Sequence, residues 1–341
     1  MSSTRKRLCL VSRISGIAGP ASFQRRLATG LARRGIDVTY DLDAHPYDAI
    51  LLIGASRQSR LLDRQRHRGI PILQRLDGMN WIHRRRWTGL RHFLRAEANN
   101  FLLRTTRDRL ADIVVYQSEF VRSWWEGAFG PARGSRVIYN GIPLEVFAPD
   151  GPARPKPDGL RIVVLEGAIG GGYEIGLHWA ADLARELAAS SRQPVQLVIA
   201  GRPRGKTPSL ERAPGVQIAW LGEVAPDAVP ELLRSGDLLF SADVHPACPN
   251  SVLEALACGL PVVAFDTGAL PEIVDGESGA IVPYGADPWK LEAPDTKALA
   301  AAAQGVLNRG EQMRRGARTR AERAFGLERM VDEYLAALGW L

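Results

Sequence analysis

Short apolar runs alternate with segments of helical periodicity along most of the chain. In the first half the apolar runs expected to form strands are 8–11, 37–40, 49–53, 71–76 and 113–116. In the second half they are 161–165, 195–200, 216–221, 238–240 and 261–265. Runs of this length without polar alternation are typical of strands that are covered on both faces. The alternation of such strands with helices predicts an α/β protein with a doubly wound parallel sheet in each half.

A stretch dense in proline and glycine separates the two halves. It has no hydrophobic periodicity, so we place a linker at 151–159 between a first domain, 1–150, and a second domain, 160–318. Residues 319–341 have helical spacing and are expected to form a C-terminal helix. A chain of 341 residues is long enough for two domains that each bury a core.

The most informative stretch for chemistry lies between residues 238 and 284. A buried strand, 238–240, leads through a polar loop with Asp243 and His245 to a helix that begins near Asn250. A helix that starts at the carboxyl edge of a parallel sheet presents its unpaired N–H groups and its positive dipole end there. The backbone N–H groups of Asn250 and Ser251 are therefore candidates for binding a phosphate.

Glu254 lies one turn into the same helix. Its carboxylate could turn back toward the crevice and bind two neighbouring hydroxyls of a ribose or another sugar. The alternative is a solvated helix carboxylate near a favourable dipole end.

The sequence of this stretch resembles the nucleotide-sugar site of retaining glycosyltransferases of family four. The matching letters are CPNSVLEALACGLPVVAFDTG and LPEIVDGESGAIVP, with VIYNGIPLEVF at the end of the first half. The resemblance implies the GT-B fold, with two Rossmann-like lobes, a cleft between them and a C-terminal helix that crosses back to the first lobe. It also implies an enzyme that transfers a sugar from a nucleotide-diphosphate donor to a glycan, lipid or small-molecule acceptor with retention. In this family an Asn-Gly turn, here Asn140 and Gly141, ends the first lobe.

The sequence departs from the family at one important position. The family has two glutamates eight positions apart, the first at the donor sugar and the second at the ribose, and Glu254 occupies the second position. Pro246 stands where the first is expected, so His245, with Asp243 nearby, is the candidate for a catalytic role there. A non-catalytic subunit that binds nucleotide sugars is therefore an alternative function.

The glycine-rich segment 167–176 is the second candidate for holding phosphate. Backbone N–H groups at Gly170 and Gly171 could cradle a diphosphate. The family usually carries an Arg and a Lys in this loop, and both are missing here. Arg202 and Lys206, after the next strand, are expected to supply the positive charge, with a solvated basic loop as the alternative.

Two candidates come from the first lobe. Gly16 and Gly19 follow the opening strand and could let the backbone approach a phosphate, or could form a plain tight turn. The family places a glycine loop here, facing the cleft. Asp77 follows the strand 71–76 and is a candidate for acceptor contact or for steering a proton, with a turn-forming Asp before Gly78 as the alternative.

Residues 81–110 are unusually rich in arginine. The arginines are Arg84, Arg85, Arg86, Arg91, Arg95, Arg104, Arg107 and Arg109. They alternate with large apolar residues, and helical spacing would gather much of the apolar set on one face, as in helices that lie on anionic membranes. The alternatives are a helix with its apolar side on the sheet and its arginines in solvent, and a nucleic-acid surface, for which no recognition motif is present.

Composition narrows the class of protein. Hydrophobic residues make up 45% and charged residues 24%, the balance of a globular protein, and the net charge of +7 favours anionic partners. The three cysteines suggest no disulfide framework, which suits a reducing cytoplasm. No spacing typical of metal ligands is present, and no cofactor is expected. No apolar run is long enough to span a bilayer, so we expect a cytoplasmic protein that is soluble or attached at the inner face of the membrane.

Overall fold

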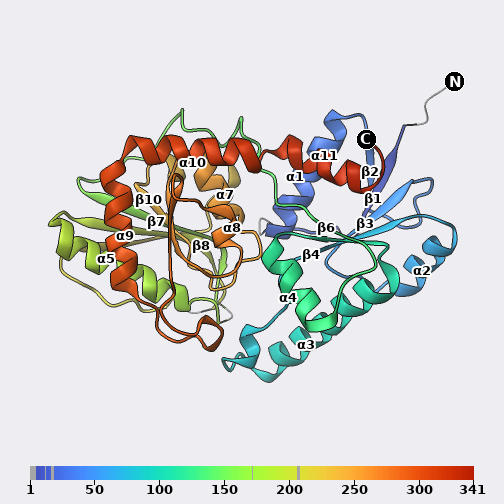
Figure 1. Ribbon diagram of the computed structural model, residues 1–341, viewed down its shortest axis with the longest axis horizontal. Coiled ribbons are helices and arrows are strands. Elements are labelled where there is room, and N and C mark those ends of the chain that lie inside the picture. Colours follow the sequence, from blue (N-terminus) through green and yellow to red (C-terminus); the bar gives the residue numbers. More distant parts are fainter. Residues whose placement is uncertain (1–4, 12, 17–18, 171, 206–207) are drawn as a thin grey trace. The chain divides into compact units, whose positions relative to one another are not determined.

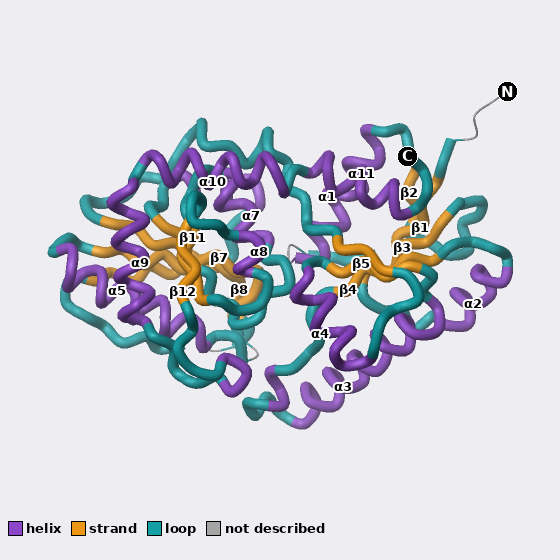
Figure 2. The backbone as a smooth tube through the Cα atoms, in the orientation of Figure 1, coloured by secondary structure: helices purple, strands orange, loops and turns teal. Residues whose placement is uncertain are grey.

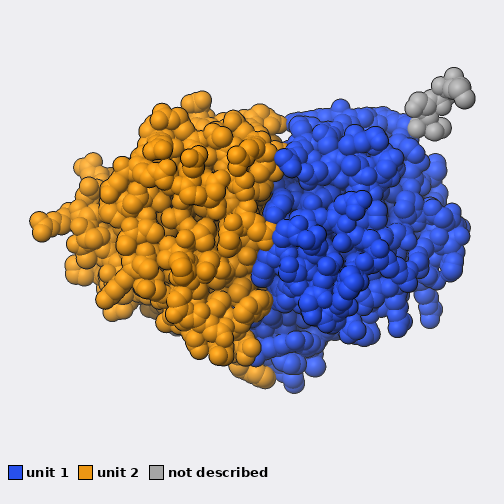
Figure 3. Space-filling view, viewed as in Figure 1, with its two compact units in different colours: residues 1–84, 88–141, 327–341 blue, residues 85–87, 142–326 orange. Residues whose placement is uncertain are grey.

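The computed structural model describes residues 5–11, 13–16, 19–170, 172–205 and 208–341. The chain forms two compact units (Figure 3). Unit 1 contains residues 1–84, 88–141 and 327–341, and unit 2 contains residues 85–87 and 142–326. Each unit is built on its own six-stranded sheet.

The sheet of unit 1 is parallel, with strand order β2-β1-β3-β4-β5-β6. Its strands are β1 (Arg7–Val11), β2 (Asp37–Thr39), β3 (Ala49–Ile53), β4 (Ile72–Leu76), β5 (Ile113–Tyr116) and β6 (Ser135–Val137). Its helices are α1 (Gly19–Arg33), α2 (Ser59–His67), η1 (Ile82–Arg84), α3 (Leu90–Thr105), η2 (Thr106–Leu110), α4 (Glu119–Phe129) and α11 (Leu327–Ala337). Every residue of β3 and β4 is buried, because helices cover both faces of the sheet (Figure 2).

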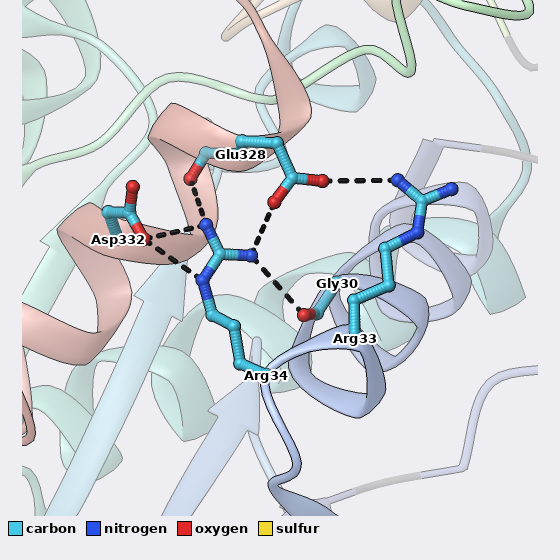
Figure 4. Close-up of polar contacts among 5 residues, drawn as sticks. All are labelled: Gly30, Arg33, Arg34, Glu328 and Asp332. Carbon is cyan, nitrogen blue, oxygen red and sulfur yellow. Dashed lines mark hydrogen bonds and ion pairs between the residues drawn. The ribbon is translucent and has the colours of Figure 1, made fainter.

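Helix α11 returns to unit 1 and packs on α1. A Cβ at Gly30 would overlap Val331, so only glycine lets these two helices approach so closely. Arg34 then fixes the end of α1, since its guanidinium donates to Asp332 Oδ1 at 2.6 Å and to Glu328 Oε2 at 2.5 Å (Figure 4). The close helix pair and the charged cluster therefore hold the C-terminal helix on the first sheet.

The sheet of unit 2 is also parallel, with strand order β12-β11-β10-β7-β8-β9. Its strands are β7 (Leu160–Ile169), β8 (Val195–Pro203), β9 (Val216–Gly222), β10 (Leu238–Phe240), β11 (Val262–Phe265) and β12 (Gly279–Val282). Its helices are α5 (Ile175–Ser191), η3 (Pro226–Ala228), α6 (Val229–Arg234), α7 (Asn250–Ala257), α8 (Leu270–Ile273), η4 (Pro288–Lys290), α9 (Thr296–Arg309) and α10 (Glu311–Ala324) (Figure 1). The predicted α/β organisation, with a parallel sheet in each half, is confirmed.

Two strands of unit 2 are longer than the sequence indicated. Strand β7 continues to Ile169 beyond a register shift between Leu165 and Ala168, and β8 continues to Pro203. The first residues of the predicted glycine loop therefore belong to a strand, and Arg202 lies in β8 rather than in a loop. The two extensions stabilise each other, because Ala168 pairs with Arg202.

The predicted turn at Asn140 and Gly141 is wrong. Neither residue is part of a turn, and both lie in the irregular connection after β6. The buried amide of Asn140 instead accepts a hydrogen bond from Arg75 Nη2 at 2.8 Å. A buried guanidinium requires such acceptors, so this asparagine satisfies an arginine in the core of unit 1.

The arginine-rich segment also differs from expectation. It is broken into η1, α3 and the π-helical turn η2, so its residues do not form one continuous face. Ala96 and Leu103 are the buried residues of α3, whereas several of its larger apolar side chains are exposed. The alternative in which the apolar side of this helix packs on the sheet is confirmed in part, because Leu103 contacts the end of β3 whereas Leu90, Leu94 and Phe101 stay in solvent. Among the described residues, no helix combines the length and the apolar character that crossing a bilayer requires.

Candidate functional site

The candidate site of unit 2 lies along the carboxyl ends of β7, β10 and β11. These strands are parallel neighbours, with Leu238 opposite Ile162 and Leu239 opposite Val262, so the loops that follow them leave from one edge of the sheet. Helix α7 follows β10 and begins at Asn250, where the sequence predicted. This edge therefore carries both the helix start and the residues that follow β7 and β10.

The first turn of α7 is arranged as an anion site would require. The carbonyl of Pro249 accepts from the N–H groups of Val252 at 3.1 Å and Leu253 at 3.3 Å. The N–H groups of Asn250 and Ser251 come before this first helical bond and so have no acceptor within the helix. They stand at the positive end of its dipole, which favours a phosphate.

Glu254 is buried one turn further along α7. The residue is 9% exposed, so the alternative of a solvated surface carboxylate is wrong. Burying an ionised carboxylate is unfavourable unless polar groups bind it, so a carboxylate at this place indicates a polar environment or a polar ligand.

Pro246 occupies the position at which the resembled family has its first glutamate. It packs tightly against the turn that follows β11. A Cβ at Gly268 would lie 2.6 Å from the backbone nitrogen of Pro246, and Gly268 has a φ of +58°. The N–H of Ala269 donates to the carbonyl of Pro246 at 2.9 Å, so the proline is fixed in place.

His245 is almost fully enclosed beside this proline. It is 7% exposed and stacks on Trp289 with the ring centroids 3.7 Å apart. Burial lowers the pKa of the imidazole to about 4. His245 is therefore a neutral ring at neutral pH, which can hydrogen-bond but carries no charge.

Two carboxyl groups interact with each other near the carboxyl ends of the neighbouring strands β7 and β10, Glu166 within β7 and Asp243 in the loop after β10. Burial raises the pKa of Glu166 to about 8, with the charge of Asp243 adding to the effect. Burial likewise raises the pKa of Asp243 to about 6, although the N–H groups of His245 and Val244 partly oppose the shift. At neutral pH such a pair of carboxyl groups keeps at least one proton. The protonated carboxyl group can then donate a hydrogen bond.

The carboxyl pair leads to a prediction for stability. In the unfolded chain Glu166 and Asp243 ionise near 4.5 and 3.8, whereas in the native state they keep protons to about pH 8 and about pH 6. The native state thus binds more protons in this window, so the free energy of unfolding falls as pH rises from about 4 to about 8 and is level above it. We expect the Glu166→Gln variant to remove roughly 4 kcal/mol of this decrease.

Urea unfolding of the two proteins at about pH 5 and about pH 8.5 measures the change. Burial also raises the pKa of Asp77 in unit 1, so Asp77 contributes to the pH dependence of stability in both proteins. Subtracting the pH dependence of the variant from that of the wild type therefore leaves the contribution of Glu166. Equal pH dependence in both proteins would show that Glu166 ionises normally.

The ends of β7 and β8 form a second part of the site. Gly170 has a φ of +133°, and a Cβ there would lie 2.6 Å from the carbonyl oxygen of Arg204. The N–H of Arg204 donates to the carbonyl of Ile169 at 2.7 Å. Gly170 is thus a position that only glycine fits. Gly171 and Lys206, which were predicted to bind phosphate, lie outside the described residues.

Arg202 lies in β8 beside the glycine-rich loop, and its guanidinium is paired with the carboxylate of Glu223. Its side chain is 55% exposed, and its Nε lies 3.6 Å from Glu223 Oε2. An exposed pair of this length is weak, so a stronger anionic ligand could replace the glutamate.

Sequence reasoning missed Arg86. The short segment Arg85–Trp87 groups with unit 2, and Arg86 Nη1 donates to the carbonyl of Gly172 at 2.9 Å. The same nitrogen lies 3.5 Å from Glu174 Oε1. Arg86 therefore brings a positive charge to the glycine loop, which lacks one of its own. Nothing in the run of neighbouring arginines distinguished it beforehand.

Gly19 and Asp77 belong to unit 1, whereas the other predicted site residues belong to unit 2. Gly19 is the first residue of α1. Asp77 follows β4, as expected, and its carbonyl accepts from Trp125 Nε1 at 2.8 Å. Burial raises the pKa of its carboxyl, and Arg75 partly offsets that effect. No group of three or more residues able to hold a metal ion occurs among the described side chains.

Comparison with known proteins identifies the class of the second unit and of the fold. Residues 161–309 match the family described as Glycosyl transferases group 1. A GDP-mannose-dependent alpha-(1-6)-phosphatidylinositol dimannoside mannosyltransferase of Mycobacterium tuberculosis is 34% identical over 145 residues, which are 42% of this chain and 35% of that protein. The chain thus matches about a third of the length of that relative.

Solved structures extend the likeness to nearly the whole chain. Sucrose-phosphate synthase of Thermosynechococcus elongatus has a TM-score of 0.74 at 16% identity, with 98% of both chains covered. Anabaena HepE, in complex with UDP-glucose, has a TM-score of 0.67 at 17% identity, with 99% of this chain and all 100% of that one covered. The two-lobe α/β fold is that of GT-B glycosyltransferases, as predicted. The matched segment 161–309 contains Glu166, Asp243, His245 and Glu254.

Proposed function

We propose that the protein is a glycosyltransferase that moves a sugar from a nucleotide-diphosphate donor to an acceptor with retention of configuration. One observation carries the proposal. Glu254 is buried one turn into α7, and the N–H groups of Asn250 and Ser251 precede the first hydrogen bond of this helix at the carboxyl edge of the sheet. Both lie within the segment that matches Glycosyl transferases group 1.

The donor would be bound mainly through its phosphates and its ribose. The N–H groups of Asn250 and Ser251 would donate to the diphosphate, and the carboxylate of Glu254 would accept from the ribose hydroxyls. The backbone at Gly170 would line the phosphates from the side of β7, with Arg202 as the neighbouring cation. Gly171 and Lys206 remain part of this proposal, as does Gly19 of unit 1.

The chemistry would depend on stabilising the leaving diphosphate. The bond between the anomeric carbon and the phosphate oxygen breaks, and the acceptor oxygen forms its bond on the same face of the sugar. The acceptor proton passes to the departing phosphate oxygen, so no separate base is required. The helix dipole and N–H groups of α7 favour the charge that grows on this phosphate.

The sugar side of the site would differ from that of the resembled family because Pro246 offers no carboxylate. We propose that His245, as a neutral imidazole, and Asp243 contact the donor sugar in its place. Asp77 of unit 1 is proposed to contact the acceptor. The names of similar proteins include GDP-mannose and UDP-glucose, so hexose donors of guanosine and uridine diphosphate are the first to test.

Calorimetric titration with UDP, GDP, ADP and their hexose derivatives tests this proposal. In the same samples, the release of free sugar from the donor measures slow turnover onto water. We expect one nucleotide series to bind, with donor breakdown. Binding without breakdown, and without transfer to any tested acceptor, would favour a non-catalytic nucleotide-sugar-binding subunit. The absence of binding to every nucleotide would overturn the donor site itself.

A further inference from the structure

Helix α3 carries a stripe of apolar side chains in solvent. Leu90, Leu94 and Phe101 are 61%, 59% and 70% exposed. They are among the most exposed large apolar residues of the described chain, and Trp87, which precedes the helix, is more exposed still. Large apolar side chains gathered in one place on a surface mark an interaction site more often than scattered ones do.

The three residues lie on one side of the helix. At about 100° per residue, Leu90, Leu94 and Phe101 fall within an arc of about 40°. By the same count the buried residues, Ala96 and Leu103, lie about 150° away. The stripe therefore points away from the body of unit 1, on whose outer side α3 runs (Figure 1).

Arginines flank this stripe. Arg91 and Arg95 follow it on one side, and both are exposed. Within the described parts of the chain, neither of them forms an ion pair. The carboxylate of α3, Glu97, is bound by Arg84 at 2.6 Å and 2.7 Å and by His83. The outward face of α3 thus combines exposed apolar side chains with uncompensated positive charge.

We propose that this α3 face, Leu90, Arg91, Leu94, Arg95 and Phe101, binds an anionic lipid surface. Apolar side chains of such a helix enter the acyl boundary while arginines on its flank bind the lipid phosphates. The helix is too short to cross a bilayer, so it would lie in the interface plane. The inference does not depend on the proposed reaction.

Charge and shape favour lipid over other partners. Nucleic acid would reward the arginines but not the apolar stripe, since bases are bound by stacking on aromatic rings and phosphates by cations. The centre of a protein interface is usually depleted of charge, whereas here exposed arginines directly border the apolar residues. A membrane interface accommodates both, because the arginines can extend toward the headgroups.

Cosedimentation with lipid vesicles tests the proposal on the full chain. The wild-type protein is mixed with vesicles of phosphatidylcholine alone and with vesicles that also contain phosphatidylglycerol. Two variants alter the face, Leu94→Ser with Phe101→Ser, and Arg91→Gln with Arg95→Gln. Arg57→Gln with Arg60→Gln is the matched control, because it removes two exposed arginines of unit 1 next to and within α2. All six residues are exposed, so folding should be unaffected.

We expect binding to the anionic vesicles only. The α3 arginine variant should bind about 25-fold more weakly at low salt, and the apolar variant at least about tenfold more weakly at any salt. The control should bind much more like the wild type than either of them.

Three outcomes would overturn the proposal. The first is no binding to either vesicle. The second is an equal loss in the Arg57/Arg60 control, which would mean that general positive charge is responsible. The third is a concentration-dependent dimer, seen by analytical ultracentrifugation, that the apolar variant abolishes. That result would assign the stripe to a second copy of the chain.

Discussion

Replacing Glu254 by Gln should weaken the binding of a nucleoside diphosphate by about tenfold or more, and Glu254→Ala by about 30-fold or more. The carboxylate can accept two hydrogen bonds from neighbouring ribose hydroxyls, and hydrogen bonds to a charged acceptor are the stronger kind. Gln keeps the shape of the buried residue, so the fold of α7 should survive. Isothermal calorimetry measures the change in Kd.

A change of ligand separates ribose contact from other effects. For the 2′,3′-dideoxy analogue of the same nucleotide, wild type and Glu254→Gln should bind equally weakly, because the partner of the carboxylate is missing in both. The control variant Glu186→Ala, on α5 in the same unit, should bind like the wild type. If Glu254→Gln lowers affinity for both ligands by the same factor, Glu254 acts on the fold of the site and not on the ribose.

The second large effect is expected at Gly176, in the first turn of α5. A Cβ there would overlap the carbonyl oxygen of Ala242 and lie 2.7 Å from its carbon and 3.0 Å from its Cα. All three atoms are backbone, so neither side can yield by turning a side chain. Gly176→Ala must push α5 away from Ala242, which lies in the loop after β10 that also carries Asp243 and His245. We expect a loss of about 3 kcal/mol of stability and weaker nucleotide binding.

A matched glycine shows that the loss arises from this contact. Gly305, on the exposed side of α9, has nothing within 4 Å of its Cβ position. Gly305→Ala should therefore stabilise the protein, by about 0.5–1 kcal/mol, because alanine favours the helix. Thermal unfolding of the two variants should shift in opposite directions. A neutral Gly176→Ala would mean that the start of α5 moves freely.

The local pattern of the sequence was sufficient for most elements. Strands β3 and β5 have the predicted bounds, and α7 begins at the predicted Asn250. These elements were predictable because their signals are local, a short run of β-branched residues or a proline before a helix. The extension of β7 to Ile169 was not, since glycines in that stretch indicated a loop and only pairing with β8 keeps it extended.

The candidate site shows the same division. Glu254 and the start of α7 could be found from the spacing of residues in the sequence. Whether the carboxylate of Glu254 is buried or solvated could not, because spacing does not determine burial. Arg86 is the opposite case. It lies far from the glycine loop in sequence, and only the folded chain brings its guanidinium to the carbonyl of Gly172.

By itself the sequence determined the alternation of strands and helices, the two sheets and the position of the α7 helix start, because each follows from periodicity and from residues close together in the chain. Only the tertiary structure decided that Glu254 is buried, that His245 is a neutral ring on Trp289 and that Leu90, Leu94 and Phe101 face solvent. Burial, pKa and exposure depend on which distant segments pack around a side chain. That packing is set by contacts between residues far apart in the sequence, which no local pattern encodes.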